Sequence, residues 1–286
     1  MLRGTDTRRA RARRPPPSLK QQYQEYVLQR IETYKNSLGR SRLIEIGGEA
    51  AAEMQDSCAG QFLLTEVLMQ EAVDRLIVKR LRLPSFNKWK QQYAERRRAQ
   101  RELTHWGLEP DGILAALLPR VEPEDQVLVA GPAVAPAAYL LAAYEATVTY
   151  IAADIGSVER MEAGLADEAL AGAAECFFVQ PGCWLPPFGS PLDLVVVDAS
   201  ALIETDPGDR AVFVRQLQAV TAAGGIHLLL PGRGGLAPEA MVAWYEGWSR
   251  DQVARTRRRG AARPSTGVVL TKPDPSSGTE IGAAER

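Results

Sequence analysis

The feature that most constrains the fold is a series of short apolar runs that alternate with helical patterns between residues 125 and 273. The clearest run, Leu192–Asp198, is almost continuously apolar, as a strand buried on both faces of a parallel sheet should be. Short strands that alternate with helices are typical of βαβ units, whose parallel strands form one sheet with helices on its faces. The pattern therefore predicts an α/β domain with a doubly wound, mostly parallel sheet.

The predicted strands and helices of this domain follow one another in regular order. We expect strands at residues 127–130, 148–152, 176–179, 192–198, 226–230 and 267–271. We expect helices at residues 135–144, 158–170, 210–221 and 238–255. The domain is predicted to cover residues 106–273, and residues 274–286 are predicted to be a disordered polar tail.

Residues 18–105 carry a helical pattern without strands. Apolar residues recur there at three- and four-residue steps, with polar and charged residues between them, which predicts a small domain of amphipathic helices. Residues 1–17 are rich in arginine and proline. They hold too little apolar surface to offset the entropy of ordering, so we predict a disordered basic tail there.

Composition argues against several classes of protein. No apolar run is long enough to span a membrane, and the arginine-rich start leads into Pro15–Pro17 instead of the apolar stretch of a secretory signal. A transit peptide is the alternative interpretation of that start. Three cysteines without a CxxC spacing and two distant histidines predict neither a disulfide framework nor a metal site. We therefore expect a cytoplasmic protein without a membrane partner.

Basic residues are concentrated in three segments, at 8–14, 88–101 and 255–263. Such segments can contact the phosphates of nucleic acid, and Phe86, Trp89 and Tyr93 interleave with the basic residues of the second segment. The simpler interpretation is a solvated helix face, with the three aromatic residues packed in a core. Both interpretations stay open from the sequence, whereas His227, inside an apolar strand, is expected to be a hydrogen-bonded core residue.

Successive segments from Tyr150 to Pro231 resemble class I S-adenosylmethionine (SAM)-dependent methyltransferases. Residues 153–161 resemble the end of that family's second strand and the helix after it, and residues 175–188 resemble its third strand and the loop that contacts adenine. Residues 191–199 resemble its fourth strand, and residues 217–230 resemble the following helix, Gly-Gly turn and strand. The resemblance implies a Rossmann-like fold, SAM as cofactor and a methyl acceptor that the sequence does not identify.

The resemblance also implies a set of cofactor-binding residues at the ends of the strands. These are Gly131, Pro132, Ala133, Asp154, Ile155, Gly182, Cys183, Trp184 and Asp198. Asp154 would accept hydrogen bonds from the ribose hydroxyls, or would only cap the next helix. Asp198 would be the catalytic residue, contacting the acceptor or taking its proton, or would only cap the segment after it. Trp184 would stack on adenine or cover the edge of the sheet.

The loop after the first strand departs from the family pattern. The family has a run of glycines there, whereas this chain has Gly131 followed by Ala133 and Ala135, and Val129 stands at the family's acidic position. Gly182 replaces the acidic residue that contacts adenine in the family. Because alanine adds a Cβ where the cofactor approaches the backbone, two hypotheses remain. The chain is a methyltransferase of unknown acceptor, or an inactive methyltransferase-like binding or scaffold protein that contacts nucleic acid through its basic segments.

Overall fold

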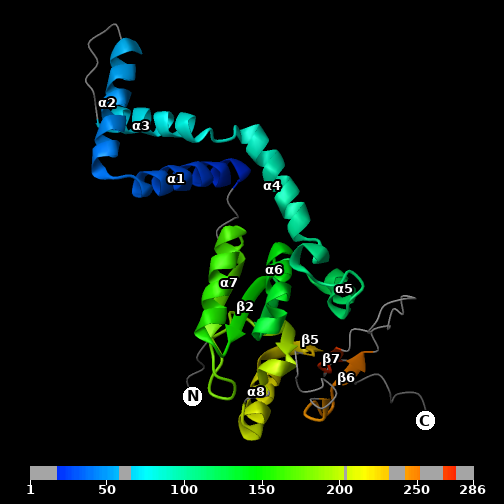
Figure 1. The fold of residues 1–286 in the computed structure, drawn as a ribbon. Helices are drawn as coiled ribbons and strands as arrows, with labels where there is room; N and C mark the ends of the chain where they lie inside the picture. Colours follow the sequence, from blue (N-terminus) through cyan, green and yellow to red (C-terminus); the bar gives the residue numbers. More distant parts are fainter. Residues whose placement is uncertain (1–17, 58–65, 203–204, 232–241, 252–266, 275–286) are drawn as a thin grey trace, which may run out of the picture. The chain divides into compact units, whose positions relative to one another are not determined.

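The computed structural model describes residues 18–57, 66–202, 205–231, 242–251 and 267–274. The chain divides into two compact units, Met1–Arg96, here called the helical unit, and Arg97–Arg286, here called the α/β unit (Figure 1). The predicted tail at 1–17, the predicted tail at 274–286 apart from Asp274, and the basic segment at 255–263 lie outside the described residues. The predicted domain bounds, 18–105 and 106–273, stay a prediction.

The described residues of the helical unit form three helices and most of a fourth. They are α1 (Leu19–Ser37), α2 (Arg40–Ser57), α3 (Glu66–Leu81) and α4 (Phe86–Gln100), the last of which continues into the α/β unit. Helix α1 begins with a capping box, in which Ser18 Oγ accepts from the Gln21 amide and Gln21 Oε1 accepts from the Ser18 amide. The aromatic residues of α4 pack on α1, where the Trp89 ring lies 5.4 Å from that of Tyr23. Trp89 is buried, which favours the core interpretation of these residues.

The α/β unit is built on a seven-stranded sheet in the order β3-β2-β1-β4-β5-β7-β6. The strands are β1 (Gln126–Ala130), β2 (Thr147–Ala152), β3 (Ala174–Phe178), β4 (Leu192–Asp198), β5 (Thr221–Leu230), β6 (Ser249–Asp251) and β7 (Val268–Thr271). Strands β1 to β5 are parallel, whereas β7 runs antiparallel to both β5 and β6. The predicted α/β class and the mostly parallel sheet are therefore confirmed.

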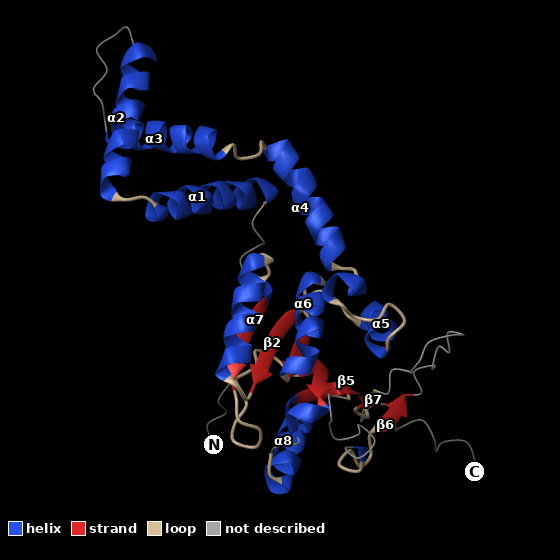
Figure 2. Cartoon of the chain, in the orientation of Figure 1, coloured by secondary structure: helices blue, strands red, loops and turns tan. Residues whose placement is uncertain are grey.

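Helices cover both faces of this sheet (Figure 2). Helices α6 (Ala135–Ala143) and α7 (Ile155–Asp167) share one buried core with alternate residues of the strands, such as Val129 and Tyr150. Helix α8 (Pro207–Val220) shares a second core with the residues that point the other way, such as Leu128 and Val195. The short helix α5 (Ile113–Leu117) packs in the first core. The central strand β4 is buried on both faces, which explains its apolar sequence.

The end of the sheet differs from the prediction in two places. Strand β5 begins at Thr221, before the Gly224-Gly225 turn, because a register shift against β4 carries the pairing past the glycines. The predicted helix at 238–255 is wrong at Ser249–Asp251, which forms β6. Gly247 precedes that strand with a φ of +78°, a conformation that turns the chain out of a helix. Residues 238–241 and 252–255 of the predicted helix lie outside the described residues.

The buried histidine of β5 has the role expected from the sequence. His227 is fully buried, and its two ring nitrogens lie 2.8 Å from Thr221 Oγ1 and 2.9 Å from Tyr245 Oη. Burial and the nearby Lys272 lower the pKa of His227 to about 3. The interpretation of His227 as a hydrogen-bonded core residue is confirmed. None of the described helices is long and apolar enough to cross a membrane.

Candidate functional site at the carboxyl ends of the strands

The sheet topology locates the expected site. In open parallel sheets, ligands bind beyond the carboxyl ends of the strands, where neighbouring strands lead into connections on opposite faces. Strand β1 pairs with β2 on one side and with β4 on the other, and the helices that follow β1 and β2 cover the face opposite α8. The loops after β1, β2, β3 and β4 therefore surround the switch point. Every residue that the sequence singled out for cofactor binding lies in one of these connections, at the first residue of α7 or at the end of β4.

The loop after β1 is a tight turn that leads directly into α6. Gly131 has a φ of +107°, which residues with a side chain rarely adopt, and its amide donates to Ile151 O at 2.9 Å. Residues Pro132–Val134 form a 3-10 turn, and α6 begins at Ala135. The single retained glycine therefore stands where the backbone itself needs one.

Asp198 fastens this loop to the end of β4. Its Oδ2 accepts a hydrogen bond from the Ala133 amide at 3.1 Å, and the residue is only 1 % exposed. A buried carboxylate that accepts from a backbone amide holds that amide in one orientation. The structure thus brings two sequence-predicted site residues, Ala133 and Asp198, into contact with each other. The sequence placed both at the site but did not indicate this bond.

Asp154 caps helix α7 and also faces solvent. Its Oδ1 accepts from the Ser157 amide at 2.7 Å, and Arg160 lies 3.8 Å from the same oxygen. Hydrogen bonds from Ser157 hold the pKa of the Asp154 carboxyl below its ordinary value, so the group is ionised at neutral pH. The side chain is 57 % exposed, which leaves it open to a ligand. The capping role is observed, and the ribose contact stays a prediction.

Large apolar side chains are exposed at the ends of β2 and β3. Ile155 follows Asp154 and is 66 % exposed, while Phe178 ends β3 and is 47 % exposed. Trp184, in the loop after β3, is 46 % exposed. Strands β2 and β3 are neighbours, with Ala152 opposite Phe178. Exposed apolar side chains beside an ionised carboxylate are a setting that suits a flat ring carrying polar hydroxyl groups.

Gly182 has a packing reason that the sequence did not reveal. Its φ is +87°, and a Cβ added there would lie 2.7 Å from Asp209 Cβ and 2.8 Å from Asp209 O. The Pro181–Cys183 turn therefore packs closely on the start of α8. Cys183 itself is exposed. Glycine is required at this position whether or not the turn contacts a cofactor.

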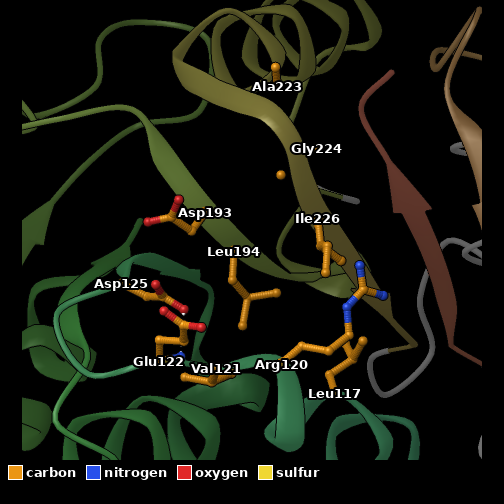
Figure 3. Close-up of a pocket in the computed structure, with 11 residues that line it drawn as sticks. Leu117, Arg120, Val121, Glu122, Asp125, Asp193, Leu194, Ala223, Gly224 and Ile226 are labelled. Carbon is orange, nitrogen blue, oxygen red and sulfur yellow. Dashed lines mark hydrogen bonds between the residues drawn. The ribbon is translucent and has the colours of Figure 1, made fainter. Parts of the chain in front are cut away.

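Two concavities of the α/β unit lie away from these residues. One, of about 230 Å³, lies at the opposite ends of the strands and is lined by Arg120, Asp125, Asp193 and Gly224 among others (Figure 3). Asp125 accepts a hydrogen bond from the Glu122 amide there, and Asp193 accepts one from the Gln126 amide, each at 2.8 Å. The other, of about 430 Å³, lies beside β3. In the described part of the chain, no group of three or more His, Cys, Asp or Glu residues could hold a metal ion.

Comparison with known proteins finds likeness of structure only. Neither a family model nor a curated protein matches the sequence. The N-methyltransferase NodS from Bradyrhizobium japonicum WM9 is 13% identical, with a TM-score of 0.45, over 56% of this chain and 93% of that one. A TehB-like SAM-dependent methyltransferase from Corynebacterium glutamicum ATCC 13032 Kitasato is 16% identical, with a TM-score of 0.45, over 64% of this chain and 97% of that one.

An rRNA methylase from Streptococcus thermophilus is 12% identical, with a TM-score of 0.43, over 58% of this chain and 98% of that one. At these identities and scores the likeness concerns the fold alone and carries nothing about cofactor, acceptor or activity. The Rossmann-like architecture of the α/β unit, with a doubly wound, mostly parallel sheet, stands on its own strand order.

Proposed function

We propose that the α/β unit is a SAM-dependent methyltransferase domain that acts on an acceptor still to be identified. The observation that carries the proposal is Asp154, an ionised and exposed carboxylate at the end of β2, beside the exposed side chains of Ile155 and Phe178. A carboxylate at this point can accept hydrogen bonds from both hydroxyls of a ribose. The apolar side chains can cover one face of an adenine ring.

The residues fit the nucleoside half of the cofactor. Asp154 would hold the ribose, and Ile155, Phe178 and Trp184 would contact the adenine. Gly131 supports the other half, because its positive φ turns the chain sharply at the end of β1 and it carries no Cβ. The Ala133 amide is already engaged by Asp198, so it is not available to the cofactor while that bond holds.

Bound SAM supplies an electrophilic methyl group to a nucleophilic acceptor. The contribution of the protein is then mainly to hold the two reactants in line and to exclude water. Asp198 fixes the turn against which the cofactor would lie, and with 1 % exposure it acts first as a positioning residue. A direct role for Asp198 in taking the acceptor's proton would require that it exchange the Ala133 amide for the acceptor.

A second function is favoured by the same hydrogen bond. The Asp198–Ala133 bond joins the turn to the end of β4 through protein groups, so the Ala133 amide already has a partner within the fold. Ala133 and Ala135 also add Cβ atoms where the resembled family has glycine. A chain of this kind could serve as a binding or scaffold protein that retains the fold after losing the chemistry.

Calorimetric titration with SAM and S-adenosylhomocysteine separates the two functions. We expect binding with a Kd in the micromolar range, about −8 kcal/mol, for the unaltered chain. We expect Asp154→Ala to weaken binding about tenfold or more, because it removes the ribose acceptor. Trp184→Ala should weaken binding less, since the ring is exposed on one side.

Asp167→Ala is the matched control, because Asp167 is an exposed carboxylate on the same helix α7 and lies outside the candidate site. It should leave the Kd unchanged. Absence of binding at millimolar ligand by the folded, unaltered chain would contradict the methyltransferase proposal and would favour the scaffold function. Equal effects of Asp154→Ala and Asp167→Ala would contradict the assignment of the site.

A further inference from the structure

Strand β3 forms one edge of the sheet, and half of its backbone groups point away from the protein. The sheet order places β2 on one side of β3, with no strand of the described chain on the other. The Val179 amide donates to Ala152 O on β2 at 2.9 Å. Because backbone groups alternate in direction along a strand, the N–H and C=O groups of Ala174, Cys176 and Phe178 point outward. An outward row of donors and acceptors is a template for a further strand.

A concavity accompanies this edge along its length. It measures about 430 Å³ and is lined by Glu162 and Leu165 of α7, by Ala171, and by residues 174–177 of β3. A strand added to β3 would point every second side chain to the α7 face of the sheet, where the concavity offers room. The thiol of Cys176 at its base is half-buried, and burial raises its pKa to about 11. The concavity therefore offers contacts and no reactive group.

The concavity at this edge carries negative charge only. Its lining includes the two acids Glu162 and Glu175 and no basic residue. Glu162 and Glu175, which line the concavity, are exposed and form no ion pair within the described part of the chain. By contrast, Glu145 in the same unit accepts from both Arg97 and Arg101. The two glutamates at the edge are thus open to a cation from outside.

We propose that the open edge of β3 binds an extended, arginine- or lysine-rich segment of a partner protein, which adds to the sheet as a further strand. The outward backbone groups of β3 supply the affinity common to strand addition, and the concavity receives alternate side chains. Glu162 and Glu175 favour a positively charged partner segment, because their negative charges attract basic side chains and repel acidic ones. This surface shares only Phe178, at the end of β3, with the proposed methyltransferase site, and the concavity is lined by other residues.

The binding test uses the full chain and a labelled ten-residue peptide of alternating arginine and valine. Fluorescence anisotropy should give saturable binding that weakens as salt rises. The double variant Glu162→Lys with Glu175→Lys should weaken the peptide about tenfold or more, since it replaces two attractions by two repulsions. Asp167→Lys, which reverses an exposed charge on α7 outside the concavity, should change the Kd less than twofold. Equal loss in both variants would overturn the proposal.

Backbone methylation of the peptide decides the question on the unaltered protein, even if the double variant fails to fold. A peptide N-methylated at every valine and one N-methylated at every arginine keep the same charge but block opposite strand edges. Strand addition requires that one of them lose binding and that the other retain it. Equal binding of both, or equal binding of a peptide with all arginines in one block, would indicate unspecific charge attraction and would overturn the proposal.

Discussion

The helical unit and the α/β unit bury their apolar residues to very different extents. The main core of the helical unit consists of Ile31, Ile46, Leu76 and Ile77, while Ile44 and Val67 are about two-thirds exposed, at 66 % and 65 %. The α/β unit has a large core on each face of its sheet. A sheet covered by helices on both faces buries much apolar surface, which gives the unit a large free energy of unfolding. A few helices with a small core bury less, so their free energy of unfolding is small. The two units should therefore respond differently to the same kind of change.

The largest expected effect comes from truncating one core residue in each unit. Phe213→Ala in α8 should lower the free energy of unfolding of the α/β unit by about 3–5 kcal/mol and leave it folded. Ile77→Ala should cost the helical unit about 2–5 kcal/mol, which is as large as the whole stability that a small core provides. We expect it to unfold α1 to α3. Hydrogen exchange followed peptide by peptide separates the two units.

Leu28→Ala is the control within the helical unit, because Leu28 is 55 % exposed and its truncation removes few contacts. It should leave the exchange of α1 close to that of the unaltered chain. Retained protection of α1 and α3 in Ile77→Ala would contradict the comparison, since it would mean that the helical unit has stability beyond its visible core.

The second-largest expected difference is in how acid changes the stability of the two units, because the only histidine buried in the described chain belongs to the α/β unit. Folding lowers the pKa of His227 to about 3, from an ordinary value of 6.5. Between these two pKa values, His227 is protonated in the unfolded chain and neutral in the folded chain. The contribution is fully present above pH 6.5 and is lost as pH falls toward 3, with a slope of up to about 1.4 kcal/mol per pH unit.

Between pH 6.5 and pH 4 the α/β unit should lose on the order of 3 kcal/mol from this group. Residues 1–96 contain no histidine, so the helical unit should lack this slope. Denaturant unfolding of the α/β unit between pH 7 and 4, with His227→Gln as the control, measures the effect. A variant with the same pH slope as the unaltered chain would show that other groups cause it.

The sequence was most informative where residues are buried by the sheet itself. Strand β4 lies at Leu192–Asp198, as its apolar run predicted, because a central strand must be apolar on both faces. Strand β6 was missed, since Ser249–Asp251 has no apolar pattern and becomes a strand only by pairing with β7. Local patterns carry no signal for such a pairing.

The sequence predicted where the residues of the candidate site lie, but not the contacts that they make with one another. The sequence placed Asp198 and Ala133 at the ends of neighbouring strands, but the bond between them depends on the path of the 3-10 turn after Gly131. The packing of Gly182 on Asp209 joins residues far apart in the chain and could not be read locally. The concavity beside β3 was missed for the same reason, because helix α7 and an edge strand form it together.

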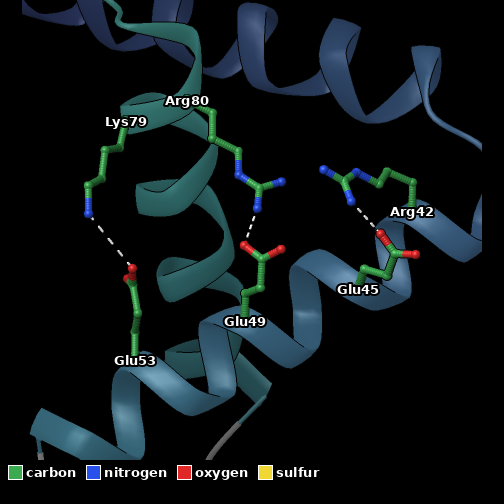
Figure 4. A network of polar contacts seen from close by, with 6 residues as sticks. All are labelled: Arg42, Glu45, Glu49, Glu53, Lys79 and Arg80. Carbon is green, nitrogen blue, oxygen red and sulfur yellow. Dashed lines mark hydrogen bonds and ion pairs between the residues drawn. The ribbon is translucent and has the colours of Figure 1, made fainter.

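The smallest effect should come from the ion pairs on the surface of the helical unit, which link α2 and α3 (Figure 4). Arg80 pairs with Glu49, and its side chain is 25% exposed. Lys79 lies 3.8 Å from Glu53 with a side chain that is 78% exposed. A pair held near the helix contact resists screening better than one in open solvent. We therefore expect Arg80→Met to lower the unfolding midpoint of the helical unit slightly, and Lys79→Met to leave it unchanged.

Both effects should be a small fraction of that of Ile77→Ala, and neither should reach the α/β unit. The difference between the two variants should shrink in 1 M salt, where the screening length falls to about 3 Å. A loss in Arg80→Met as large as that in Ile77→Ala would reverse the comparison, because the helical unit would then depend on its charges more than on its core. An unchanged midpoint in both variants at low salt would sharpen the comparison, because these two ion pairs would then add nothing to the stability that apolar packing gives the unit.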